Sequence, residues 1–565
     1  MGGPGQAGPT LSIPHFAWSE LFNMLIEVAL WCVLALSLVE QLARAFRWTK
    51  TQRVGQWVLT LTAVAIALRV LVPFAPANWY LGVSNVPSVH HFSRSTALVP
   101  LPLRLLTFDL AQGALAARVF NLLASAVMIP LFVWAIHLAG FPRRVALLVG
   151  VLVAGVPMYV RYGASDGSHA TLLMLYTVAT VAFLRLYQGL SGPLGICALG
   201  SALLLGVPIR LESGVLFLFI PLLLWSPVRS LWSILTARPL VLAVFLVSFL
   251  IALVWQWDFH AQSLAIYSRP HLASAIIALL SRVFFVPNPS IVGFFPPLLA
   301  IPAWFFLAHL VRVRAWAELV CLYTPILLCG IPSAFADGPF VGLPAAGYHV
   351  ISVLFVVLAI ARALDWGWDR LRSDWKTRKR SWPLFAAVAA LPLAASTAFA
   401  WCYTYAWQEE YTFLNKQLPS EAATILTVWD ADTGTSDLDC CLALPYPTFS
   451  PDRPHLRWIV LGKQDLALTR MEHLQFDYYY PGTMASLDSR SLDSWRGRLV
   501  ASRPEQRTLL RTHLAQMREL DQLVRRHHHL VPLAREQVPA HTFSSVAFAD
   551  DQVQLVFYRH IQQPH

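Results

Sequence analysis

The chain has 565 residues, of which 56% are hydrophobic and only 13% are charged. Soluble domains average about 25% charged residues, so this composition excludes an ordinary soluble protein and is typical of a polytopic membrane protein. The net charge of +11 does not indicate nucleic-acid binding, because Lys and Arg fall in short segments that flank apolar runs, where they set membrane orientation. The seven cysteines show no CxxC or Cys/His ligand spacing, so we predict no cysteine metal site.

A membrane-spanning helix needs roughly 20 mostly apolar residues. Twelve stretches meet this criterion and predict an α-helical transmembrane domain over residues 21–401, after a short outer segment over 1–20. We expect the spans at 21–43, 54–73, 114–138, 144–160, 169–188, 193–209, 213–227, 239–256, 291–311, 317–335, 348–365 and 383–401.

Basic side chains are distributed unevenly between the two sides of this topology. The loops on one side hold seventeen Lys and Arg, whereas the short loops on the other side hold six arginines. Cytoplasmic loops carry the excess of Lys and Arg, so the side with seventeen basic residues is cytoplasmic. Twelve spans, an even number, then place both termini on the outer face. Arginine also far outnumbers lysine, which is typical of a GC-rich bacterial genome, so we expect a multi-pass protein of the bacterial cytoplasmic membrane.

Residues 402–565 predict a soluble α/β domain on the outer face. The stretches ATILTVWD, LRWIVLG and VQLVFYRH resemble strands, and TLLRTHLAQMRELDQLVRRHHHL has the apolar spacing of a helix. Three adjacent histidines cannot all face one ion, so RHHHL, Arg526 to Leu530, predicts a solvated helix end. A disulfide from Cys402 to Cys440 or Cys441 is compatible with an outer location, and its pairing stays open.

Ionisable residues gather in two outer turns. VRYGASDGSHATLLMLY, residues 160–176, carries Arg161, Asp166 and His169, and GVPIRLESGVLFLF, residues 206–219, carries Arg210 and Glu212. Ionisable groups at the edges of spans are costly and are therefore functional candidates, although a salt bridge or snorkelling explains any single one of them. Taken together, arginines with few acids suit an anionic head group whose lipid tail stays in the bilayer, because Arg forms a fork that fits phosphate.

Residues 101–187 also resemble the GT-C glycosyltransferases of the protein O-mannosyltransferase and aminoarabinose transferase superfamily. The similar features are a Pro-containing outer loop, the helix start Ala116-Ala117-Arg118, and a P-x-x-x-R-Y helix end at 157–162 followed by an acidic outer turn. IRLESGVLFLFIPLLLW is similar to the family's Arg/Glu-Gly helix start. The resemblance covers roughly residues 55–365.

The resemblance implies transfer of a sugar from a polyprenyl-phosphate carrier to a lipid, glycan or protein acceptor on the outer face. An acid in the first large outer loop would activate the acceptor hydroxyl, but loop 74–112 has Asn78-Trp79-Tyr80 where that acid is expected. Asp166 is therefore the leading candidate for the base, with His90, His91 and Asp109 as alternates. The candidates for binding the phosphate and the sugar are Arg94, Arg161, Arg210, Glu212, Arg269, Arg282, Trp79 and Tyr80.

Three functions are compatible with the missing acid. In the first, another residue serves as the base and the chain is a transferase. In the second, the chain keeps the fold as an inactive lipid-carrier binder or scaffold. In the third, it transports a lipid-linked substrate. A transporter of the common kind would show two repeated halves with broken helices, and no such duplication is visible. We expect membrane lipids and a polyprenyl-phosphate carrier as partners, no nucleic acid, and a cavity bounded by loops 74–112, 161–168 and 257–290. No cofactor or metal is assigned, and a requirement for a divalent ion stays open.

Overall fold

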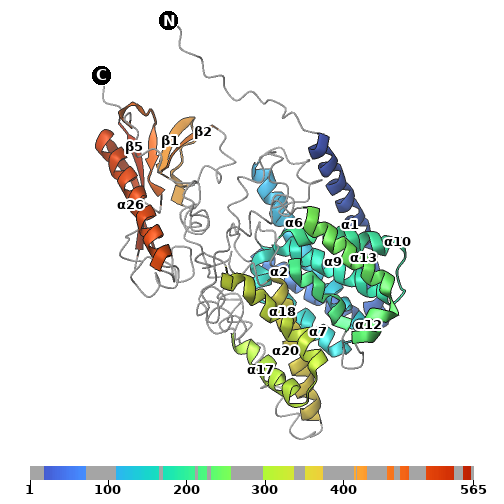
Figure 1. Cartoon of the computed structure of the whole chain (residues 1–565). Coiled ribbons are helices and arrows are strands. Elements are labelled where there is room, and N and C mark those ends of the chain that lie inside the picture. Colours follow the sequence, from blue (N-terminus) through green and yellow to red (C-terminus); the bar gives the residue numbers. More distant parts are fainter. Residues whose placement is uncertain are drawn as a thin grey trace.

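The computed structural model describes a helical part and a C-terminal part of the chain (Figure 1). In the helical part it describes residues 18–71, 110–164, 169–209, 214–224, 231–255, 297–335 and 350–372. In the C-terminal part it describes residues 413–414, 416–428, 455–462, 471–482, 504–539 and 552–561.

The helical part follows the order of the expected spans. The helices are α1 (Trp18–Thr51), α2 (Gly55–Leu71), α6 (Leu110–Leu138), α7 (Arg143–Gly155), α8 (Pro157–Gly163), α9 (His169–Tyr187), α10 (Pro193–Gly206), α12 (Leu231–Ala237), α13 (Pro239–Trp255), α17 (Pro297–Arg312), α18 (Trp316–Phe335) and α20 (Val350–Arg372). Within the described residues, four stretches are long and apolar enough to cross a membrane: Leu25–Thr51, Val119–Leu138, His169–Tyr187 and Val350–Arg370. Shorter apolar helices lie at most of the other expected spans, and the span expected at 383–401 lies outside the described residues. The total of twelve stays a prediction.

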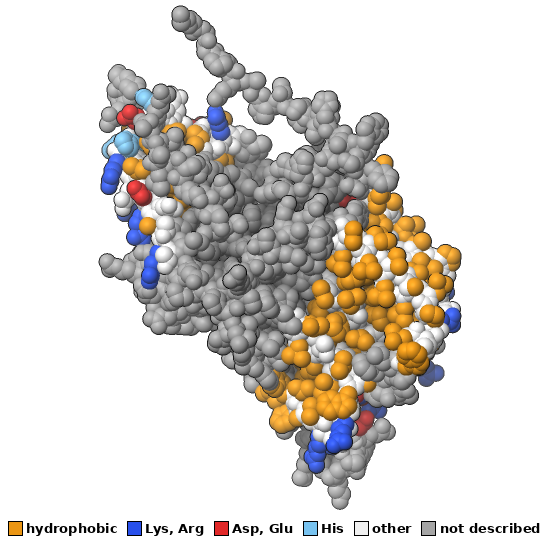
Figure 2. All heavy atoms as spheres, in the orientation of Figure 1, with side chains coloured by type: hydrophobic (Ala, Val, Ile, Leu, Met, Phe, Trp, Pro, Cys, Tyr) orange, Lys and Arg blue, Asp and Glu red, His pale blue; other side chains and the backbone are white. Residues whose placement is uncertain are grey.

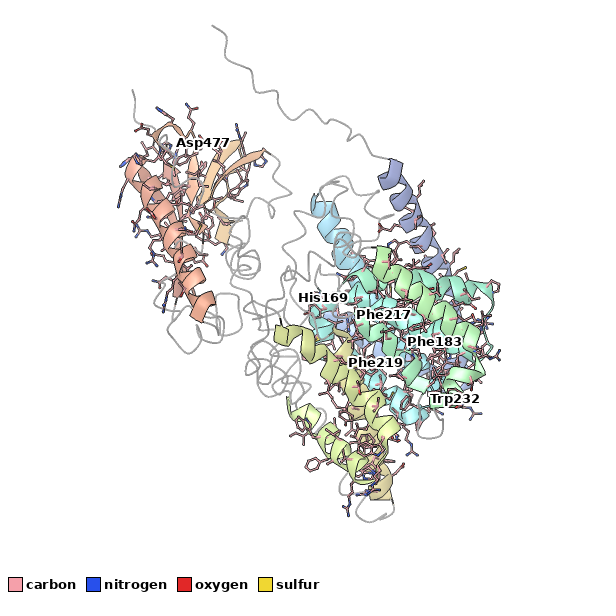
Figure 3. All side chains as sticks on the ribbon, in the orientation of Figure 1. His169, Phe183, Phe217, Phe219, Trp232 and Asp477 are labelled. Atoms are coloured by element: carbon pink, nitrogen blue, oxygen red, sulfur yellow. The ribbon has the colours of Figure 1, made fainter. Side chains whose placement is uncertain are left out.

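Helix α9 is the centre of the bundle. Every one of its residues is buried, and it packs against α6 on one side and α10 on another. Phe183 and Tyr176 of α9 make edge-to-face contacts with Phe245 and Phe217, with ring centroids 5.3 Å and 5.1 Å apart (Figure 3). Such ring contacts add about 1 kcal/mol each beyond the area they bury. Other helices surround α9, and this explains why apolar residues occur on all of its sides.

Two of the expected spans are not single continuous α-helices. The span expected at 144–160 is interrupted at Val156, which has an extended backbone conformation between α7 and α8. Pro157 follows it, and a proline disfavours helical geometry in the residue before it. The span expected at 213–227 contains the 3₁₀ segments Val215–Phe219 and Pro221–Leu224. Apolar composition predicted both segments but did not reveal these breaks.

The described surface of the bundle is that of a membrane protein. Figure 2 shows a broad apolar face over the helices, with basic side chains toward one end. Three large tryptophan side chains, Trp57, Trp232 and Trp316, are 67%, 73% and 54% exposed. They are close in sequence to Arg53, Arg238 and Arg314, and tryptophan with basic residues marks the membrane–water interface. This combination places one interface at the end of the bundle where α2, α12 and α18 begin.

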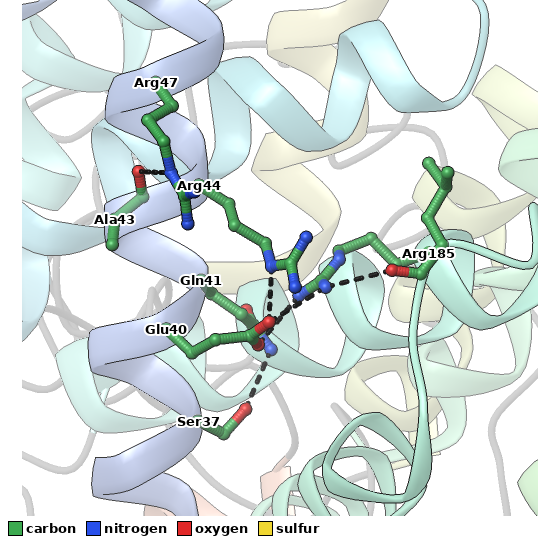
Figure 4. A network of polar contacts seen from close by, with 8 residues as sticks. Ser37, Glu40, Gln41, Ala43, Arg44, Arg47 and Arg185 are labelled. Atoms are coloured by element: carbon green, nitrogen blue, oxygen red, sulfur yellow. Dashed lines mark hydrogen bonds and ion pairs between the residues drawn. The ribbon is translucent and has the colours of Figure 1, made fainter.

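An ion-pair network at this end joins α1 to α9 (Figure 4). Arg185, whose side chain is 3% exposed, donates from Nη1 and Nη2 to the Glu40 carboxylate at 2.9 Å and 3.0 Å. Its Nη2 also donates to Leu190 O at 3.2 Å, and its guanidinium lies 5.7 Å from the Trp134 ring centroid. Arg44 contacts the same carboxylate from the exposed face of α1. Glu40 therefore neutralises the buried cation of α9.

The C-terminal part is a five-stranded mixed sheet in the order β2-β1-β3-β5-β4. Its strands are β1 (Ala423–Val428), β2 (Leu456–Leu461), β3 (Tyr478–Tyr480), β4 (Leu530–Pro539) and β5 (Gln552–His560), and its helix α26 spans Pro504–His527. Strand β1 is parallel to β2 and β3, whereas β5 is antiparallel to β3 and β4. The three strand segments and the helix expected from the sequence are confirmed, and β3 and β4 were missed.

Helix α26 is fixed to the sheet by apolar and polar contacts. Leu514, Met517, Leu520 and Val524 lie in one core with the strands. Asp521 accepts a hydrogen bond from Tyr479 of β3 at 2.8 Å, and two from Arg525 at 2.8 Å and 2.9 Å. The predicted solvated helix end is wrong for one histidine: His528 is only 7% exposed, whereas its neighbours in the sequence are exposed as expected.

The Glu40–Arg185 pair gives the first testable prediction. Glu40→Gln leaves a buried guanidinium without its counter-ion and should lower the free energy of unfolding by about 2 kcal/mol. Arg44→Gln removes only an exposed partner of the same carboxylate, so a change within about 0.5 kcal/mol is expected. Unfolding by dodecyl sulfate in mixed micelles measures both, and equal effects would contradict this assignment.

Candidate functional site

Helices α2, α7 and α8 end around one buried arginine, beside Ser125 of α6, at the other end of the bundle. Helix α2 packs against α6 and α8, and α8 packs against α6 and α9. Arg69, in the last turn of α2, is 0% exposed among them. Figure 3 shows His169, the first residue of α9, and Trp232 of α12 at opposite ends of the bundle. The Arg69 region is therefore far from the interface marked by Trp232.

One side of the Arg69 guanidinium is fixed by backbone carbonyls. Nη1 donates to Ala65 O of its own helix at 2.9 Å and to Ala154 O of α7 at 3.2 Å. Nε and Nη2 have no hydrogen-bond partner among the described residues. These two nitrogens form the edge of arginine that binds a carboxylate or a phosphate with two parallel hydrogen bonds. Because an unpaired buried charge costs several kcal/mol, these two nitrogens favour an anionic partner.

Gly163 makes room for the arginine. A Cβ atom at this position would lie 2.6 Å from Arg69 Nε and 2.7 Å from Arg69 Cδ, and it would also overlap the Ser125 hydroxyl. Only glycine lets the end of α8 approach the guanidinium this closely. Ser125 donates to Leu122 O at 3.0 Å, so its hydroxyl is held in place beside the same position. Gly163 thus packs closely against the Nε side of the guanidinium, with Ser125 beside it.

Polar and aromatic side chains surround the connection between α8 and α9. Tyr162 and His169 stack with ring centroids 4.0 Å apart and planes at 21°, and both are buried. Thr171 of α9 donates to Asn121 Oδ1 of α6 at 3.3 Å, and both of these side chains are also buried. The residues that begin and end the connection 165–168 are thereby fixed in the bundle. Asp166 belongs to this connection in the sequence.

Most of the sequence-predicted site residues lie outside the described residues, so their convergence is not tested. Arg161 is on α8, one residue before Tyr162, and only its backbone is described. The candidates outside the described residues are Trp79, Tyr80, His90, His91, Arg94, Asp109, Asp166, Arg210, Glu212, Arg269 and Arg282. In the part of the chain that is described, no group of three or more His, Cys, Asp or Glu could hold a metal ion.

Arg69 was missed by the sequence analysis. Its signal is a single arginine inside an otherwise apolar helix, and such a residue is a functional candidate by default. The arginines of the outer loops drew attention instead, because Arg69 falls within the span expected at 54–73. Its importance comes from Ala154 and Gly163, which contact it from a distant part of the sequence.

Comparison with known proteins gives weak structural similarities. No protein-family model and no curated protein sequence matches the chain. The chain is similar to the oligosaccharyltransferase of Archaeoglobus fulgidus in its apo form, with 13% identity, a TM-score of 0.43, and coverage of 82% of this chain and 72% of that one. The same enzyme tethered to an acceptor peptide matches with 14% identity, a TM-score of 0.44 and the same coverage. A third structure, the archaeal oligosaccharyltransferase AglB with an inhibitory peptide and a dolichol-phosphate, matches with 11% identity, a TM-score of 0.35, and coverage of 67% and 62%. At TM-scores below 0.5 these similarities carry no functional assignment.

The close approach at Gly163 is directly testable. Gly163→Ala places a methyl group against Arg69 and Ser125, and overpacking of this kind should destabilise the bundle by about 1–3 kcal/mol. Gly367→Ala is the matched control, because no atom lies within 4 Å of the added Cβ in α20, and a gain of about 0.5–1 kcal/mol is expected there. Unfolding by dodecyl sulfate in mixed micelles measures the stability of both variants. A neutral Gly163→Ala variant would show that Arg69 is not held against α8.

Proposed function

We propose that this chain is a membrane glycosyltransferase that moves a sugar from a polyprenyl-phosphate donor to a lipid, glycan or protein acceptor on the outer face of the bacterial cytoplasmic membrane. The observation that carries the proposal is the buried Arg69, whose Nε and Nη2 lack a hydrogen-bond partner among the described residues. A two-pronged anion receptor at the end of an apolar bundle fits a substrate that combines a phosphate with a lipid tail. The sequence resemblance to GT-C glycosyltransferases supplies the reaction.

The chemistry is a direct displacement at the anomeric carbon. The acceptor hydroxyl oxygen forms a bond to the anomeric carbon while the bond from that carbon to the phosphate oxygen breaks, and the acceptor proton passes to a base. Negative charge develops on the leaving phosphate. Fixed donors in an apolar environment stabilise such charge without reorganising, which is commonly the largest catalytic contribution. Two carbonyls already hold Arg69, so its remaining N–H groups are donors that are fixed in place before the reaction.

We assign the base to Asp166, which follows the end of α8 in the sequence. It is three residues after Gly163 in the sequence, and Gly163 packs against Arg69. His90, His91 and Asp109 are the alternate bases, since an imidazole or a carboxylate is able to accept the proton. The proposed partners of the donor and acceptor are Arg94, Arg161, Arg210, Glu212, Arg269 and Arg282, with Trp79 and Tyr80 stacking on the sugar.

Transfer of labelled sugar from a polyprenyl-phosphate donor in reconstituted vesicles tests these roles. Asp166→Asn keeps the size of the side chain but removes the base, and turnover should fall by about 100-fold or more. Arg69→Lys keeps the charge but loses the two-pronged edge, and turnover should fall by about tenfold to 100-fold.

Arg312→Lys is the matched control for the arginine, because Arg312 is exposed at the end of α17, and it should leave turnover within about twofold. Unchanged turnover in Asp166→Asn removes this residue as the base. Unchanged turnover in Arg69→Lys, with the protein folded, removes the phosphate role of the buried arginine. Absence of transfer by the unaltered chain with any polyprenyl-phosphate sugar contradicts the function itself.

A further inference from the structure

Two histidines, one at the end of α26 and one at the end of β5, face each other. His528 follows the last residue of α26, and His560 is the last residue of β5. His528 Nδ1 lies 3.3 Å from His560 Nε2, and the two rings are nearly perpendicular, with centroids 4.9 Å apart. Neither histidine takes part in the proposed transfer reaction.

The outer nitrogen of each ring contacts a backbone carbonyl. His528 Nε2 lies 2.8 Å from Met471 O, and His560 Nδ1 lies 2.9 Å from Phe476 O. A carbonyl oxygen only accepts hydrogen bonds, so both of these nitrogens must carry a hydrogen. A neutral imidazole has a single N–H. If both rings are neutral, the two facing nitrogens therefore have no hydrogen and direct lone pairs at each other.

One additional proton resolves this conflict. It converts the contact between the facing nitrogens into an N–H···N hydrogen bond and gives one imidazolium and one neutral imidazole. A second additional proton would place two N–H groups against each other. The arrangement of carbonyl, ring, ring and carbonyl is thus complete with a single shared positive charge, and the two rings titrate as a unit.

We propose that His528 and His560 form a proton-binding pair that fastens the end of β5 to the end of α26 when it holds one proton and loosens this junction when it holds none or two. The pair is a pH-sensitive device of the C-terminal part and is independent of the proposed transfer reaction.

The surroundings of the two rings agree with this assignment. Burial lowers the pKa of the His528 imidazole, which favours its neutral, accepting form. His560 is half-buried and stacks on Phe476, with ring centroids 4.4 Å apart and planes at 21°. Phe476 also contacts the His528 ring edge-to-face, with centroids 4.7 Å apart. One phenyl ring therefore packs against both members of the pair.

Other charged groups lie on each element that packs against the pair. They are Arg525, Arg526, His527 and His529 at the end of α26, Glu472 and His473 in the 3₁₀ turn Met471–His473, Asp477 before β3, and Arg559 in β5. The Asp477 carboxylate accepts a hydrogen bond from Thr424 N at 2.8 Å, and the charge of His527 further lowers the pKa of His528. No hydrogen bond or ion pair from a carboxylate to either ring is found within the described residues.

The pair connects three parts of the fold that are distant in sequence. His528 continues α26 through a hydrogen bond from its N–H to Val524 O at 3.0 Å, and the His560 N–H donates to Asp477 O at 2.9 Å. Ile561 N donates to His529 O at 2.9 Å. Loss of the shared proton should therefore weaken the junction of β5, α26 and segment 471–477 together, while β2, at the far edge of the sheet, stays unaffected.

Hydrogen–deuterium exchange of the full chain in detergent micelles, with a chelator present, tests the proposal. Exchange is followed by mass spectrometry between about pH 5 and 8, with labelling times adjusted for the intrinsic exchange rate. In the unaltered chain, protection of peptides from 552–561 should pass through a maximum and fall by about tenfold toward higher pH, since hydrogen bonds to charged groups contribute about 1.5–3 kcal/mol. Peptides from β2, residues 456–461, are the internal reference.

Two variants keep the outer hydrogen bonds but remove the shared proton. The amide nitrogen of His528→Gln replaces Nε2, and that of His560→Asn replaces Nδ1, so the donors to Met471 O and Phe476 O are retained. Both variants should give protection of 552–561 that changes less than about twofold over the pH range. His455→Gln, which alters an exposed histidine before β2, should keep the maximum. A flat profile in the unaltered chain, or a maximum that persists in His528→Gln and His560→Asn, overturns the proposal.

Discussion

The structure depends on how buried charge is compensated inside an apolar bundle. Water cannot solvate a guanidinium there, so each buried arginine must find carbonyls, carboxylates or aromatic rings within the protein. Arg185 finds all three: Glu40, Leu190 O and Trp134. Arg69 has two carbonyls, and its second edge has no partner among the described residues. This contrast separates an arginine that joins helices from one that is suited to binding an anion.

The position of Arg69 gives that difference a functional meaning. It lies at the end of the bundle where 72–109 leaves α2, and it contacts Gly163 just before connection 165–168. The tryptophans and most of the described arginines of the bundle mark the other end. One end of the bundle therefore carries the tryptophans and basic side chains of the membrane interface, and the other carries the buried Arg69, whose Nε and Nη2 have no partner among the described residues.

The C-terminal part also buries polar and titratable groups, and it compensates them in two different ways. Asp521 receives hydrogen bonds from Tyr479 and Arg525, so a buried carboxylate is fully used in holding α26 on the sheet. His528 and His560 are held by carbonyls on their outer sides, and the contact between them is satisfied only by a proton. The first arrangement joins a carboxylate to a phenol and a guanidinium, whereas the second is the proposed pH-sensitive pair.

The sequence by itself determined the class of the protein and most of its elements. Apolar length located the helices, and alternation located β1, β2 and β5, because these signals depend on neighbours along the chain. It did not reveal the break at Val156, strand β4 or the burial of His528, which depend on packing. The tertiary structure alone decided which polar groups meet: Arg69 and Ala154 are 85 residues apart in sequence, and His528 and His560 are 32 apart. Their contacts are set by helix packing and strand order, and no local pattern records either.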